Sequence, residues 1–265
     1  MSATELAKVN GIHIEYKVEG NLNGPVLVFS NSLLAELMIW DKQVKALSDK
    51  YKIVRYNHRG HGRTSVVPLG GTIDWKILAD DVIALLDYLK ISKVHAFIGV
   101  SMGGATALAL GIHYSSRFER IFVCDISWKS APGGEIALEE RAKLAREDKP
   151  ALVNATLNRW FSKQFQDANP EVVEQIRQNA LNTPTDGFIL CLTSLKNYDM
   201  SEDAKTKIKT KVYLVCGEND ANFVGAQEEM KLGIPGAEYI SIPDAGHLPN
   251  VEQASVFTSV LEKRL

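Results

Sequence analysis

The sequence contains few cysteines and no strong excess of charge of either sign. Its 265 residues include three cysteines, and 30 Lys and Arg residues nearly balance 32 Asp and Glu residues, so the formal net charge is −2. Cys124, Cys191 and Cys216 are odd in number, widely spaced and embedded in apolar sequence, so we expect buried free thiols and neither a disulfide framework nor a metal site. The balanced charge makes nucleic acid and anionic membranes poor candidate partners.

Long apolar runs are also missing. No run approaches the length of a membrane span, and residues 1–5 show no basic segment leading into an apolar stretch. A hydrophobic fraction of 45% and a charged fraction of 23% are ordinary for a globular protein. We therefore expect a soluble cytoplasmic protein with one large α/β domain, or one domain that carries an insertion.

The first half of the sequence alternates between strand and helix patterns. Asn10-Gly11 is a strong type I′ turn signal and predicts a hairpin over residues 6–18. Short apolar runs predict strands, and apolar residues at helical spacing predict the helices between them. This alternation predicts a mostly parallel sheet with helices on both faces. The expected strands are 25–30, 52–57, 93–98 and 120–124, and the expected helices are 36–49, 77–89 and 106–111.

The pattern changes between Ser130 and Lys196, where no strand signal occurs. Helices are expected over 135–147 and 151–165 and from Pro170 and Pro184 onward, because Pro is favoured in the first turn of a helix. The alternation then resumes, with strands at 212–216 and 239–242 and helices at 223–232 and from Asn250 onward. We therefore predict a core formed by residues 1–129 and 197–265 and a helical cap formed by residues 130–196.

A G-x-S-x-G motif, Gly99-Val100-Ser101-Met102-Gly103, lies between an expected strand and an expected helix. In this setting the serine occupies a sharp, strained turn that exposes its hydroxyl at the top of a sheet. The neighbouring residues must be small, since a Cβ there would collide with the adjacent chain. The alternative is an ordinary glycine-rich loop, but the context favours Ser101 as a nucleophile.

A serine nucleophile needs a general base, for which histidine has the appropriate pKa. His247 follows the carboxyl end of an expected strand, where functional loops of a parallel sheet collect, and it comes last in the order serine, acid, histidine. His61 is the rival, because it too lies in a loop after a strand.

The acid that orients the histidine is expected to be Asp220. It lies in the loop after the strand that precedes the strand of His247. Asp125 is the alternative, since it ends the strand directly before the helical insertion. Asp244 is only three residues from His247 and is better explained as a turn residue.

An oxyanion hole requires two backbone N–H groups aimed at one point. The residue after the nucleophile supplies one of them in this type of turn, which indicates Met102. The other is expected from the loop after strand 26–29, and counting along that loop indicates Leu33.

Motifs spread over nearly the whole chain carry a resemblance to a known family. The chain resembles the α/β-hydrolases throughout, and more specifically the 3-oxoadipate enol-lactonases. This resemblance implies an α/β-hydrolase fold and a serine hydrolase that cleaves a small-molecule ester or lactone through an acyl-enzyme, without a metal or organic cofactor. The motifs are Phe29-Ser30-Asn31-Ser32-Leu33, Trp40-Asp41-Lys42-Gln43, Arg59-Gly60-His61-Gly62-Arg63-Thr64-Ser65, Gly99-Val100-Ser101-Met102-Gly103-Gly104, Trp160-Phe161-Ser162, Gly187-Phe188, Tyr198-Asp199-Met200 and His247-Leu248-Pro249-Asn250-Val251-Glu252-Gln253.

The chain departs from this family near the expected pocket. Leu34 replaces the usual glycine after Asn-Ser-Leu, Asn57 replaces an aspartate, and Ala137–Arg141 stands where enol-lactonases tend to carry a substrate-facing Trp near an Arg. These departures leave the identity of the lactone open.

Four residues are named as candidate substrate contacts, and two of them have a packing alternative. Trp128 lies just before the cap and could equally pack at its hinge, whereas the position of Trp160 within an amphipathic helix favours the cap core. The alternative functions are a hydrolase of C–C bonds in ring-fission diketones and a slow-turnover receptor for small ligands, and a homodimer is one assembly to test. The four residues are Leu34, Trp128, Arg141 and Trp160.

Overall fold

The computed structural model describes residues 3–66 and 73–265, so Met1 and Ser2 of the opening segment lie outside it. Eight strands form one sheet in the order β1-β2-β4-β3-β5-β6-β7-β8. The central strand β5 carries Ser101 at its end, which puts the G-x-S-x-G turn near the middle of the sheet. The strands are β1 (Glu5–Val9), β2 (Ile12–Gly20), β3 (Val26–Ser30), β4 (Lys52–Tyr56), β5 (Val94–Val100), β6 (Phe118–Cys124), β7 (Lys211–Gly217) and β8 (Glu238–Ile242).

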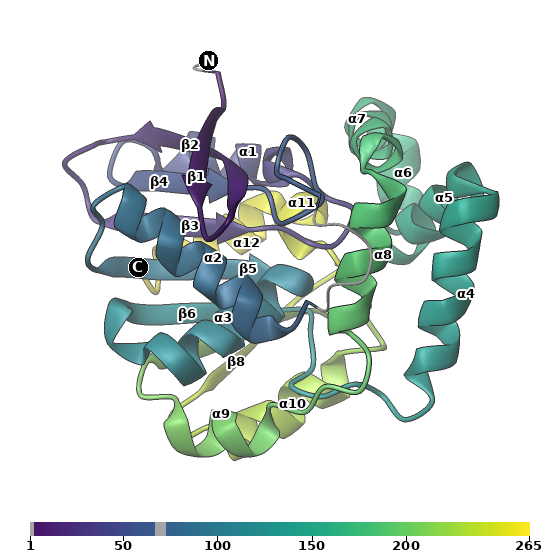
Figure 1. The fold of residues 1–265 in the computed structure, drawn as a ribbon. Coiled ribbons are helices and arrows are strands. Elements are labelled where there is room, and N and C mark those ends of the chain that lie inside the picture. The colour runs from purple at the N-terminus through teal and green to yellow at the C-terminus, as the bar shows by residue number, and fades with distance from the viewer. Residues whose placement is uncertain (1–2, 67–72) are drawn as a thin grey trace.

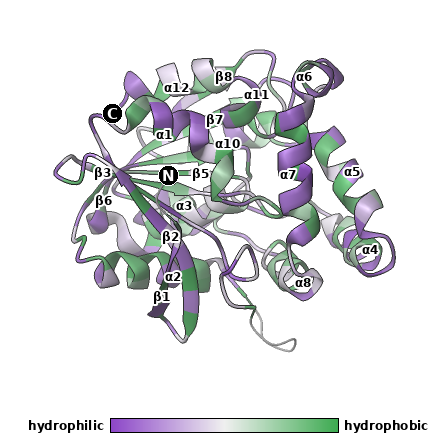
Figure 2. Ribbon diagram, turned by 90° about the horizontal axis from the view of Figure 1, so that it is seen from above, coloured by the Kyte–Doolittle hydropathy of each residue, from purple (hydrophilic) through white to green (hydrophobic). Residues whose placement is uncertain are grey.

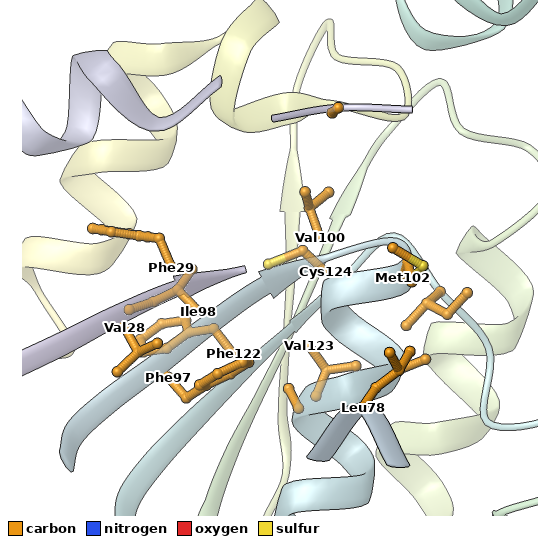
Figure 3. Close-up of a cluster of buried hydrophobic side chains, with 14 of the residues drawn as sticks. Val28, Phe29, Leu78, Phe97, Ile98, Val100, Met102, Phe122, Val123 and Cys124 are labelled. Atoms are coloured by element: carbon orange, nitrogen blue, oxygen red, sulfur yellow. The ribbon is translucent and has the colours of Figure 1, made fainter. Parts of the chain in front are cut away.

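The sheet is mostly parallel, as the strand–helix alternation predicts. Only β2 runs against its neighbours β1 and β4, and β3 to β8 pair in parallel. Strands β3 to β7 are almost completely buried because helices cover both of their faces. Side chains of β3, β5 and β6, such as Phe29, Ile98 and Phe122, pack together in the core drawn in Figure 3.

Helices lie on both faces of this sheet (Figure 1). Helices α2 (Trp75–Tyr88), α3 (Met102–Tyr114), α9 (Ser201–Lys207) and α10 (Val224–Gly233) contact one another on one face. Helices α1 (Asp41–Leu47), α11 (Pro249–Glu252) and α12 (Ala254–Glu262) pack together on the other. Among the helices described, none combines the length and hydrophobicity that a bilayer span requires.

Residues 130–196, all of which the structure describes, contain five helices beside the sheet and no strand. An isolated bridge between Lys129 and Asp199 lies at the base of this segment. The five helices stand along one side of the sheet in Figure 2, where hydrophilic residues are frequent on α7. That this segment acts as a cap over the sheet stays a prediction. The helices are α4 (Gly134–Glu147), α5 (Lys149–Trp160), α6 (Lys163–Ala168), α7 (Pro170–Asn182) and α8 (Thr185–Ser194).

Three expected helices are divided in the structure, and α9 has no counterpart among the expected helices. The helix expected from Asn250 onward is interrupted at Gln253, between α11 and α12. The helix predicted over 151–165 breaks at Ser162, whose hydroxyl accepts the N–H of Phe165 and begins α6. The helix predicted over 36–49 begins as a 3₁₀ turn, Leu37–Trp40, before α1. Helix α9 has seven residues, too few to show a periodic apolar pattern. All three cysteines are described, and they are buried and free of disulfides, as predicted.

Candidate active site

Ser101 occupies a strained turn between β5 and α3. Its backbone has φ 56° and ψ −115°, a conformation that few non-glycine residues adopt. The turn is tight because α3 starts at the next residue, and a Cβ at Gly103 would lie 2.3 Å from the carbonyl oxygen of Ser30. The strain that the motif predicts is therefore present, and Ser101 remains accessible from a cavity that it lines.

Two backbone N–H groups lie beside the Ser101 turn without an acceptor. The loop after β3 is attached to α3 by the N–H of Gly103, which donates to the carbonyl of Asn31 at 2.9 Å. Among the described residues, neither the Leu33 N–H nor the Met102 N–H has a hydrogen-bond acceptor. Both groups are therefore available to a negatively charged oxygen, as an oxyanion hole requires.

His61 holds this loop in place through two hydrogen bonds. Its Nδ1–H donates to the carbonyl of Arg59, and its Nε2 accepts the N–H of Leu34, both at 3.0 Å. Leu34 has φ 70°, a left-handed conformation that the bond to His61 stabilises. His61 is fully buried and does not line the cavity, so its position suits a support of the loop and not a general base.

His247 and Asp220 form a short hydrogen bond at the carboxyl ends of β8 and β7. Nδ1 of His247 donates to Oδ2 of Asp220 at 2.6 Å, and both side chains are buried. Their loops meet closely because Gly217 has no side chain; a Cβ there would lie 2.0 Å from the carbonyl oxygen of Gly246. Nε2 of His247 is buried and has no partner in the described part of the chain, which leaves it available to a proton from Ser101.

The loop of His247 is also tied to the helical segment. Glu252 accepts the Gly246 N–H at 2.7 Å and the Ser162 N–H at 2.9 Å. The imidazole of His247 packs against the ring of Phe223, with 5.4 Å between centroids. These contacts hold the imidazole between the sheet and the junction of α5 and α6.

A cavity of about 510 Å³ brings these groups together. Ser101, His247 and Leu33 line it from the sheet side, and residues of α4 and α5 line it from the other side. Ser101 and His247 do not form a hydrogen bond in this structure, as is common before substrate binds. The cavity therefore opens onto Ser101.

Two arginines, Arg141 and Arg159, line this cavity. Arg141 of α4 stacks over the Phe188 ring at 5.5 Å, and Arg159 of α5 is accessible from the cavity. Within residues 3–66 and 73–265 neither guanidinium forms an ion pair or a hydrogen bond. Loss of solvent lowers the pKa of both groups, that of Arg141 to about 10, and the charge of Arg159 contributes to the shift of Arg141. The negative charges of Asp220 and Asp125 oppose the shift of Arg159.

These arginines also affect the histidine. Burial and, after it, the positive charge of Arg159 lower the pKa of His247 to about 4, whereas the bond to Asp220 opposes the shift. The imidazole is therefore neutral at neutral pH, the form in which it can accept a proton. Sequence reasoning missed Arg159, because nothing in a charged, amphipathic helix marks the one arginine that faces a cavity.

Of the four residues expected to contact substrate, Arg141 lines the cavity and the other three do not. Trp128 is buried against Gly233 and below Lys205, which agrees with its packing alternative. Trp160 is completely buried, and Leu34 has no exposed surface. None of these three side chains lines the cavity, because each fills the space between packed elements. Arg59 is likewise structural, since it pairs with Asp81 at 2.5 Å.

Asp125 is completely buried behind Asp220. It does not contact His247 by a hydrogen bond, and its Oδ1 accepts the N–H of Gly217 at 2.8 Å. One carboxylate oxygen of Asp125, one of Asp220 and one ring nitrogen of His247 lie within 4.8 Å of one another. Metal binding there would have to break the 2.6 Å hydrogen bond, so the cluster is better explained by acid–base chemistry.

Comparison with known proteins agrees with this fold. A model of the alpha/beta hydrolase fold family matches residues 25–254. The chain is 32% identical to 3-oxoadipate enol-lactonase 2 of Acinetobacter baylyi over 253 residues, which cover 95% of this chain and 92% of the relative. The crystal structure of the enol-lactonase from Burkholderia xenovorans LB400 superposes with a TM-score of 0.91 and 32% identity over 98% of both chains.

A hydrolase from Pseudomonas aeruginosa PA01 is also similar in structure. It has a TM-score of 0.90 and 28% identity, covering 98% of this chain and 97% of that chain. The match to the family model covers well over half of the residues, and the similarity to enol-lactonases extends over nearly the full length. The chain therefore belongs to the α/β-hydrolase fold family and is an enol-lactonase-like hydrolase.

Proposed function

We propose that the protein is a serine hydrolase that cleaves a small ester or lactone bearing a carboxylate group. The observation that carries this proposal is the composition of the cavity, where a serine in a strained turn and a histidine bonded to aspartate face two arginines that form no ion pair within the described residues. An anionic substrate could pair with these guanidinium groups. The relatives named as 3-oxoadipate enol-lactonases fit this substrate class.

Ser101 acts as the nucleophile in this mechanism. Its Oγ attacks the ester carbonyl while Nε2 of His247 takes the hydroxyl proton. Asp220 accepts the Nδ1–H bond, which selects the required tautomer and stabilises the imidazolium that forms.

The oxyanion forms within reach of the N–H groups of Leu33 and Met102. Hydrogen bonds that strengthen as charge develops lower the barrier, and loss of one such donor typically costs about 10²–10³ in rate. His247 then gives its proton to the leaving alcohol, which in a lactone stays attached to the acyl group. Water activated by His247 releases the acid and restores Ser101.

A hydrolysis panel with a matched variant tests this mechanism. Ser101→Ala should lower ester turnover by at least about 10⁴-fold and abolish labelling by a fluorophosphonate, because the nucleophile is absent. The panel should contain enol-lactones, saturated lactones and short acyl esters, each as a free carboxylate and as its methyl ester. Undiminished hydrolysis by the variant would overturn the mechanism.

The paired substrates test the substrate class separately. Carboxylate-bearing substrates should have the higher kcat/KM, and equal values for acid and methyl ester would remove the role of the arginines. Ring-fission diketones belong in the same panel, since preferential turnover of these would support C–C bond cleavage. Tight binding of a lactone with no turnover would instead support a receptor.

A further inference from the structure

Glu252 joins two segments that are distant in the sequence, and nothing in the mechanism above uses it. It ends α11 and is buried, with 8% of its surface exposed. Its Oε1 accepts the N–H of Ser162 at 2.9 Å and the Ser162 hydroxyl at 2.5 Å, and its Oε2 accepts the N–H of Gly246 at 2.7 Å. Both carboxylate oxygens are therefore engaged, each by a different segment.

These bonds explain why the residue at this position is an acid. A carboxylate offers two acceptor oxygens at a fixed separation. A glutamine amide offers one oxygen, and its NH₂ group would face the N–H donor of one segment. The arrangement at Glu252 thus suits a residue that holds two segments at one spacing.

The two segments carry the histidine and one of the arginines of the cavity. Gly246 directly precedes His247, and Ser162 lies just beyond the end of α5. The backbones also meet here, since a Cβ at Gly246 would lie 2.7 Å from the carbonyl oxygen of Trp160. Arg159 lies in the last turn of α5 and lines the cavity together with His247. The carboxylate thus fixes the end of α5 against the loop of the histidine.

The other arginine of the cavity is positioned differently. Arg141 belongs to α4 and stacks over the ring of Phe188 in α8, with 5.5 Å between the guanidinium carbon and the ring centroid. Helix α4 packs against α5 and α8, so contacts among the helices of residues 130–196 place Arg141. By contrast, the helix end that carries Arg159 is tied directly to the loop of the base.

We propose that Glu252 is a positioning residue that sets the spacing between Arg159 and His247, and that this spacing favours substrates bearing a carboxylate. The inference rests on the proposed function. A substrate whose carboxylate binds Arg159 must at the same time present its ester carbonyl to Ser101, so a shift of the end of α5 misplaces it. A methyl ester makes no charged contact with Arg159 and depends less on that spacing.

Three variants test this inference: Glu252→Gln, Arg159→Gln and the double variant. The readout is the ratio of kcat/KM for a carboxylate-bearing ester to that for its methyl ester, because a general loss of activity cancels in this ratio. Glu252→Gln should lower the ratio at least about 5-fold, since the amide keeps an acceptor for one segment and releases the other. The double variant should have the ratio of Arg159→Gln alone, as expected when two residues act through one contact.

Ser162 allows a second and smaller change. Ser162→Ala removes one of the three donors and should lower the ratio about 2-fold, whereas Ser162→Thr keeps the hydroxyl and should retain the ratio. Ser162→Ala replaces Glu252→Gln if the latter does not fold. Glu238→Gln is the matched control and should leave the ratio unchanged, because this exposed acid begins β8 and pairs with Lys211 at 3.0 Å, whereas the loop of His247 follows the other end of that strand.

The possible outcomes distinguish the two proposals. A wild-type ratio above one that is unchanged in Glu252→Gln and in Ser162→Ala overturns the role of Glu252 alone. A double variant whose ratio falls well below that of Arg159→Gln does the same, because Glu252 would then act by another route. A wild-type ratio of one overturns the carboxylate preference, and a wild-type protein that neither hydrolyses esters nor reacts with the fluorophosphonate overturns the proposed function itself.

Discussion

At Ser101 the backbone departs from the conformations that serine prefers, and its surroundings maintain that departure. The N–H of Ser101 donates to the carbonyl of Cys124 at 2.8 Å, and Gly103 approaches Ser30 so closely that no side chain fits between them. A left-handed non-glycine residue costs about 1–3 kcal/mol, which the packing of β5 and α3 must offset. The geometry of the turn therefore depends on small neighbours as much as on the serine.

Gly103→Ala should disrupt this turn. The added Cβ would meet the Ser30 backbone at 2.3 Å, so the free energy of unfolding should fall by about 3 kcal/mol and ester turnover should fall at least tenfold. The control is Gly225→Ala in α10, where no atom lies within 4 Å of the new Cβ and alanine should add about 0.5–1 kcal/mol. Urea unfolding and kcat measure both, and an unaffected Gly103→Ala would contradict the packing argument.

Arg159 should contribute to the acid limit of activity. Since the base must be neutral and the pKa of His247 is about 4, kcat/KM should decline only as the pH falls toward 4. Arg159→Gln removes a positive charge that lowers this pKa, so the acid limb of the pH profile should move to higher pH.

The same variant should weaken the binding of carboxylate-bearing substrates. Loss of a charged hydrogen bond costs about 1.5–3 kcal/mol, or roughly 10- to 150-fold in KM, while the methyl esters should be little affected. Lys163→Gln is the matched control, because this exposed lysine of α6 pairs with Asp167 on the surface. A variant whose pH profile and KM match those of Lys163→Gln would exclude Arg159 from the site.

At the scale of elements, the loop after β3 is held from two directions. Gly103 of α3 binds the carbonyl of Asn31, and Asn31 also reaches the loop after β4, where its side chain donates to Asn57 at 3.0 Å. His61 adds the contact to Leu34. Three contacts from two elements, α3 and the loop after β4, thus set the position of the Leu33 N–H.

His61→Leu should remove the hydrogen bond that holds this loop at Leu34. Without an acceptor for the Leu34 N–H, the neighbouring Leu33 donor loses its fixed position, so kcat should fall by about 10²-fold with a small change in KM. His61→Gln can keep an acceptor oxygen near the position of Nε2 and should retain more of the activity. Measurements of kcat and KM decide this, and equal losses in the two variants would show that the hydrogen bond is not the cause.

At the scale of the whole molecule, the core buries three neutral histidines. Burial lowers the pKa of His58 to about 3 and those of His61 and His247 to about 4. The unfolded chain binds protons at these positions below pH 6.5 and the folded chain does not, so their contribution to stability is present above pH 6.5 and is lost as the pH falls toward 4. We expect the protein to lose stability on mild acidification.

His58→Gln should reduce this sensitivity to acid. Removing one such histidine should lower the slope of unfolding free energy against pH by up to about 1.4 kcal/mol per pH unit between pH 6 and 4. Its contact to Ser30, 2.9 Å in the native protein, can be retained by the glutamine amide. His13→Gln on the exposed first hairpin is the control. Urea unfolding at several pH values gives the slope of unfolding free energy against pH for each variant. Identical slopes for His58→Gln and His13→Gln would contradict the burial argument.

Most of the fold could be predicted from the sequence because its signals are local. Asn10-Gly11 sets the first hairpin through backbone conformations that these two residues accept, and both have positive φ in the structure. The division of the helix at Ser162 was missed, since an apolar stripe continues across a break that a single hydroxyl produces.

The sequence by itself determined the fold class and the loops in which Ser101, Asp220 and His247 lie, because strand–helix alternation and turn chemistry act over a few residues. Only the tertiary structure decided which side chains of α4 and α5 face the cavity, and it revealed Asp125 behind Asp220. It also placed the side chains of Trp128 and Trp160 in the packed interior, where they do not line that cavity. These outcomes depend on how distant elements pack over the sheet, and residues at one helical spacing can meet either solvent, core or substrate.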